Sequence, residues 1–468
     1  MADQALATQP TVESTTTPPP SGRSAKIRQT LLADLFPAAP PPRRIRSWHI
    51  LGMAAVWTAL VATSLVRQSG PGALDTVWAE DGAVFLSRAL QTSALDTVAE
   101  PYAGYLHVVP RLGAELVTLL PLTRAANALA LLGAGITAAT ALLVYAASAG
   151  HLRSVTLRAL LAGMVVLHPI LLPESLNSLA FTQWPLTYAA FWLALWRPAR
   201  TSASLLASIV LFLTVLSAPF AAILLPVLLL RSAVLHGWRD RIPAVLFLAG
   251  LALQLWGVLA LQSHVSQPPG GTPEQLLAVY RVLAAAPAAF GFIGVKLTAE
   301  LREALELSAL LLWPVVTLVA LRRSNPHGLT ALLAAGVSLA ILTVSIYVRG
   351  SAPVILDIIP SQGPGATRHG VVPVLLLITV LALAIDVRPR RIPAPAWQHL
   401  QVGVLAFLLF VAGGHFFRPN SRSAGPSWSA EVTKGVHACQ GGAQEVVLET
   451  SPGGMGWQLQ VPCARLPQ

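Results

Sequence analysis

Two adjacent carboxylates, Glu80 and Asp81, are the first residues of this chain whose types and spacing could do chemistry. They lie in the sequence Trp-Ala-Glu-Asp-Gly at 78–82, after the first long apolar segment. A carboxylate within hydrogen-bonding reach of a hydroxyl can accept its proton as a general base. A carboxylate can also hold a divalent metal such as Mg²⁺ or Mn²⁺. The structural alternatives are that Asp81 caps a helix that begins at Gly82 and that Glu80 is a solvated loop charge.

Aromatic, histidine and arginine side chains follow in the sequence Pro-Tyr-Ala-Gly-Tyr-Leu-His-Val-Val-Pro-Arg at 101–111. The planar guanidinium of Arg111 is suited to binding a phosphate, and His107 could contact a phosphate or a hydroxyl. Tyr102 and Tyr105 fit stacking against a sugar ring. The alternatives are that arginine and tyrosine side chains anchor the chain at a membrane surface.

Two further groups of polar side chains belong to the candidate site. The first combines hydrogen-bonding groups with an aromatic ring at the end of an apolar run: Glu174, Asn177, Gln183 and Trp184. The second is a loop with the phosphate candidates Arg368 and Arg349 and the weaker candidate Asp357. Hydrogen bonding at a helix end explains the first group equally well.

The composition indicates that these polar groups lie in a membrane protein. The 468-residue chain is 54% hydrophobic and 11% charged, whereas soluble proteins carry about 25% charged residues. Its net charge of +11 comes from short basic clusters between apolar runs. This is the positive-inside pattern of membrane topology, so we expect no nucleic-acid partner.

The apolar runs predict an all-α polytopic membrane protein with about eleven membrane-spanning helices, in a range of about 10–13. A transmembrane barrel would show alternating polarity, and these runs are continuous. The predicted spans are 48–66, 125–147, 156–172, 185–196, 205–216, 220–230, 245–261, 304–321, 329–348, 371–385 and 400–412.

The basic clusters also predict the orientation, with a cytoplasmic N-terminus and an extracytoplasmic C-terminus in a cell membrane. Residues 1–46 are rich in Thr, Pro and Ala, which predicts a disordered cytoplasmic tail. The transmembrane domain covers 47–413, with an outer loop at 67–123. Within that loop, 106–120 is interpreted as a helix at the outer interface. A full span there is the alternative, but it would reverse the charge pattern downstream.

Residues 414–468 are predicted to form a small extracytoplasmic module. Its Cys439 and Cys463 are the only cysteines of the chain. A pair confined to one short segment predicts a disulfide in an oxidising compartment, which would stabilise the module by roughly 3–4 kcal/mol. The sequence also lacks a Walker A run, His-Glu-x-x-His and Cys-x-x-Cys, which argues against an ATP-driven pump and a zinc protease.

Together the outer-loop motifs at 78–82 and 101–111, the Glu174–Trp184 segment and the cysteine-paired tail resemble the GT-C superfamily of polytopic membrane glycosyltransferases. The likeness is closest to uncharacterised actinobacterial multi-pass proteins with a Trp-Ala-Glu-Asp-Gly outer loop. It covers the chain from about residue 48 to its end. One departure is Arg368-His369, where many relatives have Arg-Tyr.

The resemblance implies an inverting transfer of a sugar from a polyprenyl-phosphate donor to a cell-envelope glycan, glycolipid or protein. Asp81 or Glu80 would be the base, or both would hold a metal, and Arg111 and Arg368 would bind the phosphate. Two other classes stay open: a transporter or flippase of lipid-linked sugars, and a non-catalytic envelope-assembly protein. Transporters bind substrate near the bilayer midplane between related halves, whereas the polar groups here cluster at one predicted face.

Overall fold

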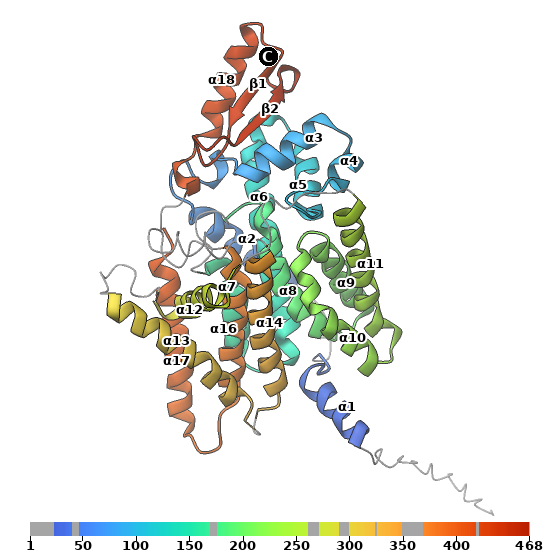
Figure 1. The fold of residues 1–468 in the computed structure, drawn as a ribbon, viewed down its shortest axis with the longest axis vertical. Helices are drawn as coiled ribbons and strands as arrows, with labels where there is room; N and C mark the ends of the chain where they lie inside the picture. The colour runs from blue at the N-terminus through green and yellow to red at the C-terminus, as the bar shows by residue number, and fades with distance from the viewer. Residues whose placement is uncertain are drawn as a thin grey trace, which may run out of the picture.

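The computed structural model describes residues 23–39, 46–168, 176–260, 271–289, 299–322, 325–348, 368–417 and 421–467. Glu174, Arg349 and Asp357 lie outside the described residues. The chain is predominantly helical. Figure 1 shows a helical bundle along the long axis, with a small C-terminal module at one end and helix α1 at the other.

Six helices in the described part of the chain are long and apolar enough to cross a membrane. A span needs about 20 apolar residues at 1.5 Å rise each. The six are α2 (Ser47–Val66), α6 (Ala125–Ala147), α11 (Trp238–Ala260), α14 (Gly328–Val348), α16 (Val371–Asp386, preceded by the turn η9, Arg368–Gly370) and α17 (Ala394–Gly414). These six helices support a multi-pass membrane protein.

Helices are present at the other five predicted spans as well, but most of them are shorter. They are α7 (Val155–Leu167), α8 (Gln183–Leu195), α9 (Thr201–Val215), α10 (Leu225–Val234, preceded by η6, Pro219–Leu224) and α13 (Ala299–Ala320). A 13-residue helix such as α8 reaches only about 20 Å. Eleven predicted spans therefore exceed the six described helices that are both long and apolar enough by themselves. A further helix, α12 (Pro273–Ala289), precedes α13.

The core of the bundle lies around α8 and α16. Every residue of α8 is buried, and so are most residues of α16. A helix that is apolar on all sides is expected at the centre of such a bundle. The Tyr188 and Thr379 hydroxyls, 2.8 Å apart, join the two helices across this core.

Short elements between α2 and α6 form one end of the bundle. They are η1 (Ala73–Asp75), the π-helical turn η2 (Asp81–Leu86), α3 (Ser87–Gln91), α4 (Ala94–Ala99), α5 (Val108–Thr118) and η3 (Leu122–Arg124). The 11 residues of α5 reach only about 16 Å. Its Leu112 and Leu116 are exposed while Arg111 and Val117 are buried. This length and two-sided character are consistent with the predicted interfacial helix.

The N-terminal segment differs from the prediction of disorder over 1–46. Residues Arg23–Asp34 form helix α1, and the following Leu35 and Phe36 are buried. The Asp34 carboxylate accepts hydrogen bonds from the backbone N–H groups of Leu329 and Thr330 at the start of α14. The Pro- and Thr-rich composition of the tail predicts disorder, but the short apolar segment that contains Leu35 and Phe36 is ordered because the bundle buries it.

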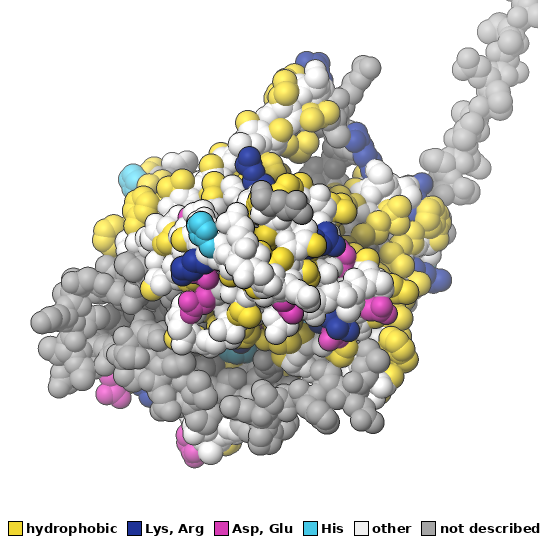
Figure 2. Space-filling model, turned by 90° about the horizontal axis from the view of Figure 1, so that it is seen from above, with side chains coloured by type: hydrophobic (Ala, Val, Ile, Leu, Met, Phe, Trp, Pro, Cys, Tyr) yellow, Lys and Arg dark blue, Asp and Glu magenta, His cyan; other side chains and the backbone are white. Residues whose placement is uncertain are grey.

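The C-terminal module consists of η10 (Ser421–Ala424), α18 (Trp428–Gln440), an antiparallel hairpin of β1 (Glu445–Glu449) and β2 (Gln458–Pro462), and η11 (Cys463–Arg465). The cross-strand pairs Val446–Val461 and Leu448–Leu459 are buried under α18. A disulfide joins Cys439 and Cys463, with Cα atoms 5.7 Å apart. Figure 2, which looks onto this end of the molecule, shows side chains of both charges interspersed on its face.

Candidate functional site

A pocket of about 340 Å³ lies at the same end of the bundle as the C-terminal module. The first two residues of α8 and the distal turns of α11 and α14 contribute to it, together with the turns η5 (Ala180–Thr182) and η9. Its lining residues are Trp78, Glu80, Phe85, Tyr102, Ala103, Gly104, Tyr105, His107, Ala180, Phe181, Gln183, Trp184, Pro219, Phe220, Val258, Val344, Ser345, Arg368 and His369.

The turn η6, which follows α9, forms one side of the pocket. Helix α9 ends at Val215, and the turn that leads from it into η6 is buried, with Ser217 and Ala218 fully enclosed. Val258 of α11 and Val344 of α14 form part of the pocket wall together with Pro219 and Phe220 of η6.

The charged centre of the pocket is an ion pair between Glu80 and Arg368. Glu80 Oε1 lies 3.7 Å from Arg368 Nη1, and the side chain of Glu80 is 13% exposed against 38% for Arg368. The second oxygen, Glu80 Oε2, is buried without a hydrogen-bond donor among the described residues. A buried carboxylate oxygen without a donor is unfavourable unless a ligand or water supplies one. Glu80 therefore lines the pocket with one carboxylate oxygen beside Arg368 and the other enclosed without a described donor.

Aromatic side chains form most of the wall around this pair. Tyr105 stacks on His107 with centroids 4.0 Å apart, and Trp184 stacks on Phe220 at 4.6 Å. The Tyr105 hydroxyl donates a hydrogen bond to Gln183 Oε1 at 3.1 Å. The indole N–H of Trp184 has no acceptor within the described part of the chain. An aromatic pocket with a few convergent polar groups is typical of a small-molecule site.

A tight turn carries Tyr102 and Tyr105 into the pocket. The two residues exchange backbone hydrogen bonds of 2.8 and 3.2 Å. The turn between them requires positive φ at both central residues, 50° at Ala103 and 94° at Gly104. This conformation suits glycine but costs an alanine about 1 kcal/mol. The strain lies at the pocket wall, where the turn fixes the direction of both rings.

Asp81 does not share the pocket with Glu80. Its carboxylate is fully buried and accepts hydrogen bonds from Ser178 Oγ and from the backbone N–H groups of Leu179 and Ala180. Successive helical residues point about 100° apart, so the two carboxylates diverge. Asp81 therefore caps the start of η5 in a distant segment, and not the helix that follows it in sequence.

Burial dominates the electrostatics of Asp81. Loss of hydration raises the pKa of the Asp81 carboxyl to about 6, while the N–H donors of Ala180 and Leu179 and the positive charge of Arg422 oppose the rise. The neighbouring Glu80 adds a smaller upward effect. A carboxylate that is enclosed and engaged by three donors has no path to a substrate hydroxyl.

The geometry also bears on the predicted metal site. Among the described residues, no group of three or more His, Cys, Asp or Glu side chains could hold a metal ion. The carboxylate of Glu80 faces a guanidinium, and that of Asp81 is turned to backbone N–H groups. The two predicted ligands do not fit a shared metal, and we derive no metal-dependent step.

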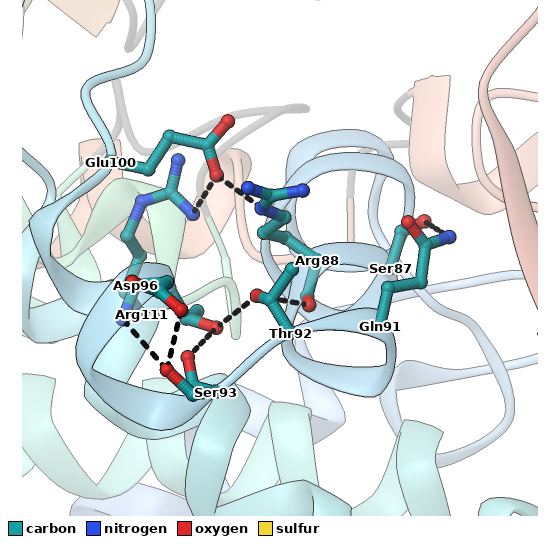
Figure 3. A network of polar contacts seen from close by, with 9 residues as sticks. Ser87, Arg88, Gln91, Thr92, Ser93, Asp96, Glu100 and Arg111 are labelled. Atoms are coloured by element: carbon teal, nitrogen blue, oxygen red, sulfur yellow. Dashed lines mark hydrogen bonds and ion pairs between the residues drawn. The ribbon is translucent and has the colours of Figure 1, made fainter. Parts of the chain in front are cut away.

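Arg111, the other phosphate candidate, is buried behind the pocket wall. Its guanidinium carbon lies 5.5 Å from the ring centroid of Phe85, and its Nη1 lies 3.8 Å from Glu100 Oε2. Arg88 holds the same carboxylate at 2.6 Å. Figure 3 shows this network across α3, α4 and α5, with Glu100 between the two arginines. Arg111 therefore supports the outer loop and does not line the pocket.

Asn177 also serves the framework. It has a positive φ of 59°, and its side chain is buried against α2. Ser64 Oγ donates to Asn177 Oδ1 at 2.8 Å, and Asn177 Nδ2 donates to the Ser64 carbonyl at 3.1 Å. Of the predicted site residues, the pocket brings together Glu80, Tyr102, Tyr105, His107, Gln183, Trp184 and Arg368.

Sequence reasoning missed two kinds of residue. The first is apolar wall residues, such as Phe85, Phe181 and Phe220, which carry no signal that separates them from other core residues. The second is Arg422, whose guanidinium donates hydrogen bonds to Thr76, Leu176 and Asn177. Its partners lie far away in the sequence, so only the fold reveals it.

Comparison with known proteins adds no assignment to this geometry: no protein family matches the chain, and no curated protein matches it.

Proposed function

We propose that this protein is an integral membrane glycosyltransferase. It would transfer a sugar from a polyprenyl-phosphate donor to a cell-envelope acceptor. The observation that carries the proposal is the Glu80–Arg368 pair in an aromatic pocket. A carboxylate that lines the pocket and a guanidinium beside it are the two charged groups that this transfer needs.

Glu80 is the general base of the proposed reaction. Its carboxylate accepts the proton of the acceptor hydroxyl as the hydroxyl oxygen forms a bond to the anomeric carbon. The bond between that carbon and the phosphate oxygen breaks, and its electron pair leaves with the polyprenyl phosphate. Attack opposite to the leaving group inverts the anomeric configuration. Glu80 is then a carboxylic acid and returns its proton to solvent.

Arg368 is the proposed phosphate ligand. A guanidinium binds phosphate through parallel charge-assisted hydrogen bonds and stabilises the charge that grows on the leaving group. At 38% exposure its side chain is open enough to exchange Glu80 for a phosphate. This exchange would also free the carboxylate for the acceptor hydroxyl. Arg111, being buried, has no part in phosphate binding in this proposal.

The aromatic wall supports sugar binding. Tyr102, Tyr105 and Trp184 offer ring faces to the C–H groups of a pyranose, and Gln183 and the Trp184 indole N–H offer hydrogen bonds to its hydroxyls. A site that combines apolar faces with a few directional polar groups orients a ligand while excluding water.

The proposed topology has eleven spans, with the short helices α7 to α10 crossing alongside the longer helices of the bundle. The pocket and the C-terminal module then lie on the extracytoplasmic side, at the level of the lipid phosphates. The N-terminus with α1 lies in the cytoplasm. Positive charges between the spans on the opposite side support this orientation.

The test is transfer of radiolabelled sugar from polyprenyl-phosphate donors in membranes that carry the wild type or Glu80→Gln. We expect wild-type transfer and a loss of roughly 10²–10⁴-fold in the variant. Glu100→Gln is the matched control, because Glu100 is a paired carboxylate of the same outer loop that does not line the pocket. Transfer that is insensitive to Glu80→Gln would contradict the role of Glu80. Translocation of lipid-linked sugars without transfer would support a transporter instead.

A further inference from the structure

We infer that Arg422 of the C-terminal module is a positioning residue that fixes both sides of the pocket around Glu80. The inference rests on the proposed function for its catalytic consequence, but its structural part stands without it. The two sides are the segment 76–81, which carries Glu80, and the segment 176–184, which carries Gln183 and Trp184.

The guanidinium of Arg422 touches both segments. Nε donates to Thr76 Oγ1 at 3.1 Å, and Nη2 donates to the Thr76 carbonyl at 2.9 Å. Nη1 donates to the carbonyls of Leu176 and Asn177 at 2.7 and 3.1 Å. The side chain is 1% exposed. One planar group thus joins two segments that are far apart in the sequence.

Asp81 joins the same two segments by a second contact. It belongs to the segment 76–81, and its carboxylate accepts hydrogen bonds from the backbone N–H groups of Leu179 and Ala180 in the segment 176–184. Arg422 therefore holds the carbonyls that precede η5, while Asp81 holds the N–H groups that begin it. The charges of Arg422 and Asp81 attract each other, which offsets part of the cost of burying both. Glu80 lies between these two attachments.

The module also holds the Glu80 segment through its backbone. Ser451 N donates to the Val77 carbonyl at 2.8 Å, and Ala79 N donates to the Ser451 carbonyl at 2.7 Å, so the two bonds flank Trp78. The module and the Glu80 segment are closely packed at this interface. A Cβ on Gly82 would lie 2.7 Å from Thr450 Cγ2, and a Cβ on Gly425 would overlap the Ser451 hydroxyl.

The chemistry of arginine explains why this residue type is required. Four acceptors arranged around one plane match the fork of a guanidinium. A lysine keeps the charge but reaches fewer of the carbonyls, and a glutamine loses both the charge and the reach. Substitution at 422 should thus displace Glu80 relative to Trp184. A misplacement of about 1 Å near reacting groups can cost roughly 10²-fold in rate.

The structural part is tested by thiol labelling in detergent-solubilised protein. The chain has two cysteines, both in the disulfide, so Ala180→Cys introduces a single reactive thiol at the pocket wall. We expect N-ethylmaleimide to label this introduced thiol roughly tenfold faster when Arg422→Gln is added, because the two sides open more often. Arg422→Lys should give an intermediate rate. An unchanged rate in folded Arg422→Gln protein would overturn the inference.

Arg231→Gln is the matched control. Arg231 is fully buried and donates to the carbonyls of Ala194 and Trp196 at the far end of α8. The substitution should reduce the yield of folded protein to a similar extent but leave the labelling rate of the introduced thiol unchanged. If Arg422→Gln does not fold, Thr76→Val removes the hydroxyl that accepts from Arg422 Nε and from Gln68 Nε2 and that donates to the Gly72 carbonyl, and it leaves the three carbonyl acceptors of Arg422 in place. It should raise the labelling rate by about threefold.

The catalytic part is tested by steady-state kinetics of sugar transfer per folded molecule. We expect Arg422→Gln to lower kcat by roughly 10–100-fold and to change the donor KM by less than about threefold, with partial rescue in Arg422→Lys. A purely structural role would lower only the amount of folded protein. If the wild type transfers no sugar, the proposed function fails, while the labelling result still decides the positioning role.

Discussion

Two buried aspartates at opposite ends of the bundle perform the same structural task. Asp34 accepts the backbone N–H groups of Leu329 and Thr330, at 2.8 and 3.0 Å, and the Thr330 hydroxyl. Asp81 accepts the N–H groups of Leu179 and Ala180, at 2.9 and 2.8 Å, and the Ser178 hydroxyl. Each carboxylate caps a helical turn that is remote in sequence, a task that satisfies otherwise unpaired N–H groups.

Each end of the bundle also contains a buried arginine. Arg231 donates to the carbonyls of Ala194, Trp196 and Asp240 near the end that carries α1. Arg422 donates to three carbonyl groups and one hydroxyl at the pocket end. Buried arginines that donate to backbone carbonyls are therefore common to both ends and do not by themselves mark a site.

The ends differ in what lies beside the capping aspartate. The neighbours of Asp34 are Ala33 and Leu35, whereas Asp81 is preceded by Glu80, whose carboxylate faces the pocket with one oxygen lacking a described donor. The comparison separates two uses of a carboxylate. A carboxylate saturated by backbone donors holds the fold, and one left partly unsatisfied in a pocket is available to a ligand.

The largest expected effect on sugar transfer follows from replacing Arg368, the guanidinium of the pocket. Arg368→Glu removes the proposed phosphate ligand and places a second carboxylate near Glu80. We expect kcat/KM for sugar transfer to fall by about 10²–10⁴-fold, because two charge-assisted hydrogen bonds are lost. Arg322→Gln, which removes a guanidinium at the far end of α13, should leave kcat/KM unchanged. Equal activity of Arg368→Glu and wild type would remove Arg368 from the site.

The structural role of Asp81 predicts a pH dependence of the free energy of unfolding. Burial raises the pKa of Asp81 from 3.8 to about 6, so the folded state binds a proton more tightly than the unfolded state. The stability that comes from this proton is full below about pH 4 and is lost as the pH rises through about 6, a change of about 3 kcal/mol.

Asp81→Asn cannot titrate at this position. Its free energy of unfolding relative to wild type should therefore increase between about pH 4 and pH 6. Thermal unfolding of both proteins in detergent across that range measures the difference, with Arg422 and Glu80 as the charged neighbours present in both. A difference that is constant with pH would contradict the raised pKa.

Asp34→Asn tests the end of the bundle that carries α1. The amide of asparagine would turn an N–H group toward backbone donors, and we expect the free energy of unfolding to fall by about 1–3 kcal/mol. Sugar transfer per folded molecule should stay at the wild-type value. Loss of transfer in protein that remains folded would show that the α1 end takes part in function.

The smallest expected effect is at the aromatic wall. Trp184→Phe keeps a ring stacked on Phe220 but removes the indole N–H that lacks an acceptor in the described chain. We expect the donor KM to rise by about two- to fivefold, the cost of one neutral hydrogen bond, with kcat unchanged. A larger fall in kcat would mean that the N–H contacts the reacting groups.

The sequence was sufficient to predict a helical membrane protein and most polar residues that gather in the pocket. Long apolar runs predict helices directly, and polar segments on one side of the membrane are brought to a common surface. Thus Glu80, His107, Gln183 and Arg368, distant in sequence, line the same pocket. The ordered α1 segment was missed because it is stabilised by burial against the bundle.

The sequence could not predict which of two adjacent carboxylates faces the pocket. The orientation depends on the helical turn η2 and on the attachment of Asp81 to residues 178–180, both of which are tertiary features. The same holds for Arg111, whose burial follows from packing of α5 against η2, and for Arg422. Residue type and spacing define candidates, and the packing of segments decides between them.

Glu80→Gln and Asp81→Asn, compared in one sugar-transfer assay per folded molecule, test the central claim most directly. The account predicts that Glu80→Gln folds as well as the wild type but loses transfer by roughly 10²–10⁴-fold. It predicts that Asp81→Asn yields less folded protein and that the folded fraction loses less transfer than Glu80→Gln, because Asp81 positions the segment that carries Glu80 and does not itself enter the pocket. The opposite pattern, with Glu80→Gln active and folded Asp81→Asn inactive, would contradict the assignment of Glu80 as the reactive carboxylate.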